Sequence, residues 1–227
     1  MAGTKPIRNT GLIRARPAAS VRGNEWGEGM RIGIYGGSFN PIHKGHIHLA
    51  LAAVEELGLD RLYFVPSKIS PHRSSDEYVS EEDRVAMIEL ACRVSEKLEV
   101  CDYELKSDRV SYTIFTVEEF RRRFPDDELF LLVGSDMLLI FDKWKRFDEI
   151  LRECTLAVVS RCEGDLPELE SKAEELRGYG RIVICRAEPI EVSSSEIRKK
   201  IAKNQKYTCY LDKNVVQYIR LNKLYRQ

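Results

Sequence analysis

Short apolar segments alternate with amphipathic ones from residue 30 to the end of the chain, and this alternation limits the possible folds more than any other feature of the sequence. Six segments are apolar nearly throughout, as buried strands are. They span residues 30–37, 61–66, 98–104, 128–136, 154–161 and 181–186. Strands without a polar face that alternate with helices are typical of a parallel sheet covered on both sides. We therefore predict a doubly wound α/β fold with a single domain over residues 30–227.

The segments between the expected strands have the spacing of amphipathic helices. Helices are expected at residues 46–58, 81–98, 111–124, 148–151, 165–180, 193–205 and 212–225. Gly58 is expected to end the first helix, and Ser80 with Asp83 forms a capping box that opens the second. These signals indicate that the helices begin and end at defined residues.

Residues 1–29 differ from the rest of the chain. They carry five basic and two acidic residues, several Gly and Pro, and no sustained hydrophobic period. Such a segment buries too little apolar surface to offset the entropy of ordering, so we expect a disordered N-terminal extension. An alternative hypothesis takes Met30 as the true start and the extension as mis-assigned.

Charge and cysteine content exclude several classes of protein. Lys plus Arg and Asp plus Glu both number 36, so no global field favours nucleic acid or an anionic membrane. No apolar run approaches the roughly 20 residues that span a bilayer, and the start lacks the apolar core of a secretory signal, so a cytoplasmic location is expected. The six cysteines are scattered without a Cys-x-x-Cys pair and are expected to be reduced and structural.

One stretch, GGSFNPIHKGHIHLA at residues 36–50, concentrates glycines and histidines where the first strand gives way to the first helix. Ligands of doubly wound sheets bind where strand carboxyl ends meet helix amino ends. Gly36 and Gly37 allow a close backbone approach, and a helix beginning at His46 offers N–H groups and a positive dipole end to a phosphate. His43 and His46 are spaced so that both can face one ligand.

Other interpretations of this stretch remain open. Zinc needs three or four ligands, and no further cluster of Cys, His or carboxylates accompanies these histidines, so no metal site is predicted. His48 falls on a different helix face and is better explained as a structural residue. Neither a Walker A loop nor Gly-x-Gly-x-x-Gly is present, which disfavours a P-loop kinase and a dinucleotide oxidoreductase.

A second polar segment, SSSEIRKK, strengthens the phosphate interpretation. Ser193 precedes Glu196 by three residues, which predicts a capped helix, and Arg198 follows within the next turn. Ser194, Ser195 and the helix amino end can hold phosphate oxygens, while Arg198 offers a bidentate fork. An ordinary capped surface helix is the alternative. Because both helix starts follow strands, a doubly wound sheet can bring them to one rim.

Together these two elements resemble the (H/T)-x-G-H nucleotidyltransferase superfamily. HKGH is at residues 43–46, and SSSEIR stands where that superfamily has I-S-S-T-x-I-R. Three more stretches, VPSKISPHR (65–73), SYTIFT (111–116) and GSDMLLIFDKW (134–144), narrow the resemblance to bacterial nicotinate-nucleotide adenylyltransferases. The match runs from about Met30 to Tyr225. Asn40 and Ser195 depart from the usual Asp and Thr, and both substitutes keep hydrogen-bonding groups.

The resemblance implies a Rossmann-like nucleotidyltransferase fold and transfer of the adenylyl group of ATP to nicotinate mononucleotide, giving nicotinate adenine dinucleotide and pyrophosphate in NAD biosynthesis. Mg²⁺ would arrive with ATP, held by phosphates and water. His43, His46 and Arg198 would be the catalytic, charge-stabilising residues. The implied ATP-binding residues are Gly36, Gly37, Ser38, Phe39, Asn40, His43, Lys44, Gly45, His46, Gly134, Ser194, Ser195 and Arg198.

For the mononucleotide, the resemblance implies that Trp144 stacks on the ring, that Thr113 and amides after Tyr112 meet its carboxylate, and that Asp136 binds ribose hydroxyls or lies near the phosphates. Arg73, Lys68 and Arg161 are further candidates. The residues alone leave Trp144 ambiguous, since an aromatic between two lysines also suits packing at the domain edge.

Three alternatives remain at this point. An enzyme of the same fold with another acceptor, such as phosphopantetheine, is disfavoured by SYTIFT and by residues 134–144. A nucleotide-binding sensor without catalysis is disfavoured by intact His43, His46 and Arg198. RNA binding through residues 121–123 is disfavoured because that basic run has acidic neighbours on a helix. The sequence leaves open whether the protein forms a homo-oligomer.

Overall fold

The computed structural model describes residues 29–68, 79–160, 166–186, 190 and 192–226. Within these ranges, six parallel strands form one sheet in the order β3-β2-β1-β4-β5-β6. The strands are β1 (Arg31–Gly37), β2 (Arg61–Pro66), β3 (Leu98–Val100), β4 (Glu128–Gly134), β5 (Thr155–Ser160) and β6 (Ile182–Arg186). The predicted doubly wound α/β domain is confirmed. The expected extension, residues 1–29, lies outside the described residues except for Gly29.

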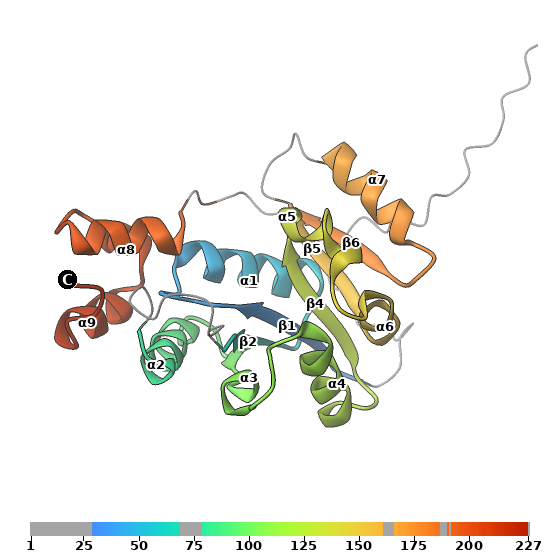
Figure 1. Cartoon of the computed structure of the whole chain (residues 1–227), viewed down its shortest axis with the longest axis horizontal. Coiled ribbons are helices and arrows are strands. Elements are labelled where there is room, and N and C mark those ends of the chain that lie inside the picture. The colour runs from blue at the N-terminus through green and yellow to red at the C-terminus, as the bar shows by residue number, and fades with distance from the viewer. Residues whose placement is uncertain (1–28, 69–78, 161–165, 187–189, 191, 227) are drawn as a thin grey trace, which may run out of the picture.

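Helices connect the strands, as the alternating pattern predicts (Figure 1). They are α1 (Lys44–Glu56), α2 (Glu81–Cys92), α3 (Tyr103–Lys106), α4 (Thr113–Arg123), α5 (Ser135–Leu138), α6 (Phe147–Glu153), α7 (Leu166–Leu176), α8 (Ser194–Ala202) and α9 (Lys213–Leu221), with 3-10 turns η2 (Phe141–Lys143) and η4 (Thr208–Tyr210). Figure 1 shows α8 and α9 together at one end of the molecule, beside α1 and α2.

The sheet separates two hydrophobic cores, because successive residues of a strand point to opposite faces. Phe130 and Leu132 of β4 pack with residues of α1, α2, α8 and α9. Leu129 and Leu131 pack on the other face with residues of α4, α6 and α7. The central strands are therefore covered on both sides, which explains why their sequence lacks a polar period.

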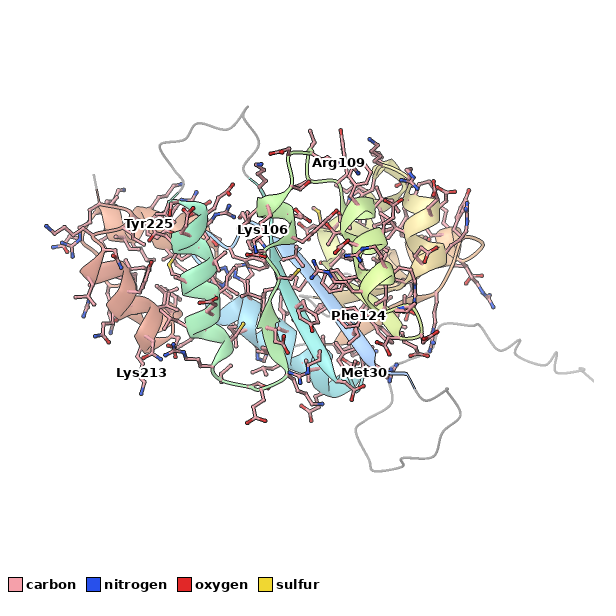
Figure 2. All side chains as sticks on the ribbon, turned by 90° about the horizontal axis from the view of Figure 1, so that it is seen from below. Met30, Lys106, Arg109, Phe124, Lys213 and Tyr225 are labelled. Atoms are coloured by element: carbon pink, nitrogen blue, oxygen red, sulfur yellow. The ribbon has the colours of Figure 1, made fainter. Side chains whose placement is uncertain are left out.

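The strand order reverses direction at β1, which pairs with β2 on one side and with β4 on the other. In a doubly wound sheet such a switch point opens a crevice at the carboxyl ends of the strands. Figure 2 shows Lys106, Arg109 and Tyr225 toward one edge of the molecule and Met30, which precedes β1, toward the opposite edge. The carboxyl ends of the strands thus share an edge with the end of the chain.

Several element boundaries differ from the prediction. The first helix begins at Lys44, not at His46, because His43 has extended backbone angles and is the N-cap. The second helix ends at Cys92, short of the expected Leu98. The third strand ends at Val100 because β2 offers it partners only for Leu98–Val100, and the following residues form the single turn α3.

Other local signals act as predicted. The Asp83 N–H donates to Ser80 Oγ at 3.0 Å, which caps α2. Gly58 has a φ of 62°, a left-handed conformation that suits glycine just beyond a helix end. At α8 the Glu196 N–H donates to Ser193 Oγ at 3.2 Å. The capping residues therefore fix where both of these helices start.

The cysteines of the described residues are free thiols, and Cys92, Cys154 and Cys185 are buried. Burial raises the pKa of each of these three thiols to about 12, so they stay protonated and serve packing. Among the helices of the described part, none is both long and apolar enough to cross a membrane.

Candidate active site

Glycine at each of the two positions that end β1 is explained by a different feature of the structure. A Cβ at Gly37 would lie 2.9 Å from the Phe39 ring, so glycine is required there for that ring to pack. A Cβ at Gly36 would meet nothing within 4 Å, and Gly36 lines the cavity described below. Protein packing therefore explains Gly37 but not Gly36, whose open side faces the cavity.

His43 and His46 form one stacked pair at the start of α1. Their ring centroids are 3.6 Å apart with an interplanar angle of 22°. The backbone N–H of His43 donates to Nδ1 of His46 at 3.3 Å. A neutral His46 therefore carries its proton on Nε2, which makes that nitrogen a hydrogen-bond donor. His46 lines the cavity, and its ring meets Phe39 edge-to-face at 5.1 Å.

Gly45 of the HKGH stretch is explained by the same stacked pair. A Cβ at Gly45 would lie 3.0 Å from His43 Nδ1 and 3.1 Å from Val192 Cγ1. Glycine at this position lets the His43 ring, which is buried, and the residue that leads into α8 approach α1 together. Lys44, by contrast, is exposed on the first turn of α1.

The start of α8 meets the turn that precedes α1, residues 38–43, which we call the β1–α1 turn. Ser194 Oγ donates to the Pro41 carbonyl at 2.9 Å, and Arg198 Nη1 donates to the Asn40 carbonyl at 2.9 Å. These pairs are 153 and 158 residues apart in sequence. The predicted meeting of the two helix starts at one rim is therefore confirmed.

The contacts at this rim brace the turn. Arg198 Nη2 also donates to Ser195 Oγ at 3.3 Å, and the carbonyl oxygens of Pro41 and Asn40 accept bonds from α8. Ser194, Ser195 and Arg198 thus all form hydrogen bonds with other groups of the protein. Phosphate binding by Ser194, Ser195 and Arg198 stays a prediction.

Beside the rim, a cavity of about 310 Å³ opens at the carboxyl ends of β1 and β4. It brings together predicted residues from both halves of the sheet, namely Gly36, Gly37, Phe39, His46, Thr113, Gly134, Asp136 and Trp144. Other predicted residues that the structure describes are not part of its lining, namely Ser38, Asn40, His43, Lys44, Gly45, Lys68, Tyr112, Ser194, Ser195 and Arg198. The candidate site thus has two regions: a polar rim, made by the β1–α1 turn and the start of α8, and a partly apolar cavity, which His46 lines beside the rim.

The position of Trp144 agrees with both interpretations of its sequence context, packing against the domain and lining a binding site. It follows η2 with its ring centroid 5.0 Å from that of Phe141, so one side packs against the domain. It is half-buried and also lines the cavity. An aromatic surface held from behind in this way is available to stack on a planar ring.

The start of α4 lies across the cavity. Tyr112 is its N-cap, no acidic residue occupies the first turn, and Thr113 lines the cavity. Lys145 Nζ lies 4.2 Å from the centroid of the Tyr112 ring. The Lys68 ammonium donates to the Ser107 carbonyl at 2.7 Å, and Lys68 is not among the residues that line the cavity. The remaining two candidates, Arg73 and Arg161, fall outside the described residues.

Glu104 is a cavity residue that the sequence did not single out. Its carboxyl is buried and accepts a hydrogen bond from Thr116 Oγ1 at 2.5 Å. Burial raises the pKa of this carboxyl, while hydrogen bonds from Thr116 and Ser111 act in the opposite direction. The sequence pattern places Glu104 in the third strand, where no periodic signal marks a cavity residue.

Arg84 and Tyr225 support the β1–α1 turn and were also missed. Arg84 is fully buried, and its Nη1 donates to the carbonyls of Ser38 and Ser67, each at 2.9 Å. Tyr225 Oη donates to Asn40 Oδ1 at 2.7 Å. In sequence Arg84 belongs to an amphipathic helix and Tyr225 to a chain end, so only the folded structure reveals these contacts.

Within the described ranges, no three His, Cys, Asp or Glu side chains gather as a metal-binding group. The exposed carboxylate at the cavity is Asp136. This donor set suits an ion that brings its own phosphate and water ligands, as Mg²⁺ does.

The fold of the chain recurs in solved structures. A Plasmodium falciparum nicotinic acid mononucleotide adenylyltransferase complexed with NaAD matches with a TM-score of 0.69 at 19% identity, over 86% of this chain and 97% of that one. The same protein complexed with APC matches with a TM-score of 0.67. At this identity the likeness establishes the fold.

Sequence comparisons are closer. The cytidylyltransferase-like family model matches residues 34–200. Proteins of Rhodopirellula baltica and Carboxydothermus hydrogenoformans, each named "Probable nicotinate-nucleotide adenylyltransferase", are 36% identical over 200 residues. The matches cover 86% and 87% of this chain and 93% and 99% of the relatives. Together with the geometry of the rim and the cavity, these matches show that the chain belongs to the nicotinate-nucleotide adenylyltransferase family.

Proposed function

We propose that this protein transfers the adenylyl group of ATP to nicotinate mononucleotide, forming nicotinate adenine dinucleotide and pyrophosphate, by direct in-line attack. The observation that carries the proposal is the meeting of α8 with the β1–α1 turn beside the cavity. It gives one rim with imidazole and guanidinium groups for a triphosphate, next to a compartment for a second nucleotide. The shared name of relatives covered almost end to end supports the same reaction.

The bond changes need no covalent enzyme intermediate. An oxygen of the mononucleotide 5′-phosphate forms a bond to the α-phosphorus of ATP, and the bond from that phosphorus to the bridging oxygen of the β-phosphate breaks. The electron pair leaves with pyrophosphate. Because the attacking phosphate is already ionised, no general base is required, and catalysis rests on positioning and charge stabilisation.

His43, His46 and Arg198 stabilise the charge of the transferring group. His46 has its Nδ1 engaged by the His43 N–H, so its Nε2 donates toward the α-phosphate oxygens. The stacked His43 holds the His46 ring in place and adds a second imidazole. Arg198 binds the β- and γ-phosphates that become the leaving group, since its planar fork matches phosphate oxygens.

The cavity accepts the mononucleotide. Its volume of about 310 Å³ falls at the lower end of the range of small-molecule sites. Trp144 stacks on the nicotinate ring, and the amide groups at the start of α4 near Thr113 receive the carboxylate, where the helix dipole favours an anion. Asp136 binds the ribose hydroxyls.

Mg²⁺ would arrive with ATP, held mainly by phosphates and water, and would lower the negative charge of the triphosphate. We propose no set of protein carboxylates dedicated to binding this ion.

A paired-acceptor assay tests the function. Purified protein is given MgATP with nicotinate mononucleotide, nicotinamide mononucleotide or phosphopantetheine, and both pyrophosphate and the dinucleotide product are measured. The expected result is fast release with nicotinate mononucleotide and slower release with the other two. Preference for phosphopantetheine would assign another acceptor, and ATP binding by calorimetry without pyrophosphate release would indicate a sensor without catalysis.

A further inference from the structure

Asn40 is held by the C-terminal part of the chain at both its side chain and its backbone. Tyr225 Oη donates to Asn40 Oδ1 at 2.7 Å across 185 residues of sequence. Arg198 Nη1 donates to the Asn40 carbonyl at 2.9 Å. Asn40 is 0% exposed. Asn40 lies three residues before His43, the N-cap of α1, so the bonds to Asn40 act on the turn that leads into that helix.

The β1–α1 turn depends on such external support. Phe39 has a φ of 44°, in the left-handed region that residues other than glycine adopt at a cost. Such a conformation persists where the surroundings fix it. Arg84 holds the Ser38 carbonyl before Phe39, and Tyr225 and Arg198 hold the residue after it. The turn is therefore fixed on both sides of its least favourable residue.

A second tyrosine of the C-terminal segment contacts α2 and not the β1–α1 turn. Tyr218 Oη donates to Asp83 Oδ1 at 2.9 Å, and the Leu224 N–H donates to the Ile219 carbonyl at 3.0 Å. Figure 2 shows Tyr225 at the edge of the molecule opposite Met30. Burial raises the pKa of the Tyr225 phenol, which favours the protonated hydroxyl that donates to Asn40.

We propose that Tyr225 is a positioning residue of the adenylyl-transfer site. Its hydroxyl fixes Asn40, and Asn40 sets the start of α1 so that the imidazoles of His43 and His46 reach the triphosphate held by Arg198. This inference rests on the proposed function of the rim. Tyr225 is thereby part of the ATP end of the site and not of the mononucleotide cavity.

Two matched variants test this role. Tyr225→Phe removes the hydroxyl that holds Asn40, and Tyr218→Phe removes a hydroxyl of the same C-terminal segment that bonds to Asp83 instead. Tyr225→Phe is expected to lower kcat/KM for ATP by about tenfold to hundredfold, because Asn40 loses a buried partner and the imidazoles shift. The KM for nicotinate mononucleotide should stay within about twofold. Tyr218→Phe should leave both parameters near those of the wild type.

Hydrogen exchange provides a readout that does not require turnover. Without substrates, Tyr225→Phe should speed amide exchange in residues 38–46 and leave residues 128–137 unchanged, whereas Tyr218→Phe should leave both segments unchanged.

The outcomes separate this inference from the proposed function. A wild-type protein that releases no pyrophosphate would overturn the function, while the exchange comparison would still decide the positioning role. The positioning role is overturned if the two variants behave alike, if Tyr225→Phe raises both KM values equally, or if it fails to fold, which would make Tyr225 a residue of general stability.

Discussion

The rim and the cavity of the candidate site are adjacent but are built in different ways. The β1–α1 turn of the rim is held by side chains that are 153, 158 and 185 residues away in sequence. The cavity is formed largely by the ends of β1 and β4, whose positions follow from strand pairing. The rim therefore depends on individual long-range hydrogen bonds, whereas the cavity depends on the sheet.

The two regions also differ in charge. Residues 193–227 contain nine Lys and Arg against two Asp and Glu, although the whole chain is balanced at 36 of each sign. Among the described residues, the cavity lining includes two carboxyl groups, Glu104 and Asp136, and no Lys or Arg. The difference suits a rim that meets the more highly charged substrate and a cavity that encloses a planar ring.

The largest effect is expected from His46→Ala, which removes a hydrogen-bond donor that lines the cavity beside the rim. The substitution should lower kcat by about 10² or more, as removal of one preorganised charge-stabilising group does, with little change in the affinity for nicotinate mononucleotide. Steady-state pyrophosphate release and calorimetry measure the two quantities. His48→Ala, which removes an imidazole from another face of α1, is the control. Near-normal turnover of the His46 variant would contradict the assignment.

A smaller effect, on the mononucleotide and not on ATP, is expected from Trp144→Ala in the cavity. Loss of a stacking ring should raise the KM for nicotinate mononucleotide by about tenfold or more, in line with the usual cost of losing aromatic stacking on a base. The KM for ATP should change little. Trp144→Phe, which retains an aromatic face, should recover part of the affinity. Equal losses for both substrates would reassign Trp144 to packing against Phe141.

Raising the ionic strength should increase the KM values of the two substrates by factors that differ a few-fold. The basic C-terminal segment raises the local concentration of a polyanion, and salt screens this attraction. Raising salt from about 0.05 to about 0.3 M should therefore increase the KM for ATP more than that for the mononucleotide. Lys199→Gln, in α8, should reduce this dependence. Parallel salt curves for the two substrates would count against the charge difference.

The smallest effect concerns stability and not turnover. Burial raises the pKa of Glu104, so the folded protein holds a proton there at pH values where the unfolded chain, with the ordinary carboxyl pKa of 4.5, has released it. The stability that this group contributes is complete below pH 4.5 and is lost as the pH rises through the folded pKa. Glu104→Gln removes this loss, so its Tm relative to the wild type should rise with pH. A constant difference in Tm across pH would refute this.

The sequence was sufficient for the parts of this molecule that periodicity and local caps determine. Apolar segments predicted the strands, and two helices that start after strands predicted that α8 could meet the start of α1. The sequence did not predict that His43 is the N-cap of α1, since His is not a usual capping residue. The single turns α3 and α5 are too short to show a helical period.

Sequence reasoning also missed the groups that act across the fold. Arg84 and Tyr225 hold the β1–α1 turn through bonds to residues 46 and 185 positions away, and Glu104 reaches the cavity from a segment expected to be a strand. No local pattern encodes such partners, because they arise only when distant elements pack. The support of the rim was thus the least predictable part of the site.

A crystal structure with a non-hydrolysable ATP analogue tests the central claim most directly. The claim is that two segments, one at the start of α1 and one at the start of α8, hold a single triphosphate. We predict that His46 and Arg198 both lie within hydrogen-bond distance of oxygens of the same bound triphosphate. A triphosphate that contacts only one of these two residues, with the other turned away from it, would contradict the account.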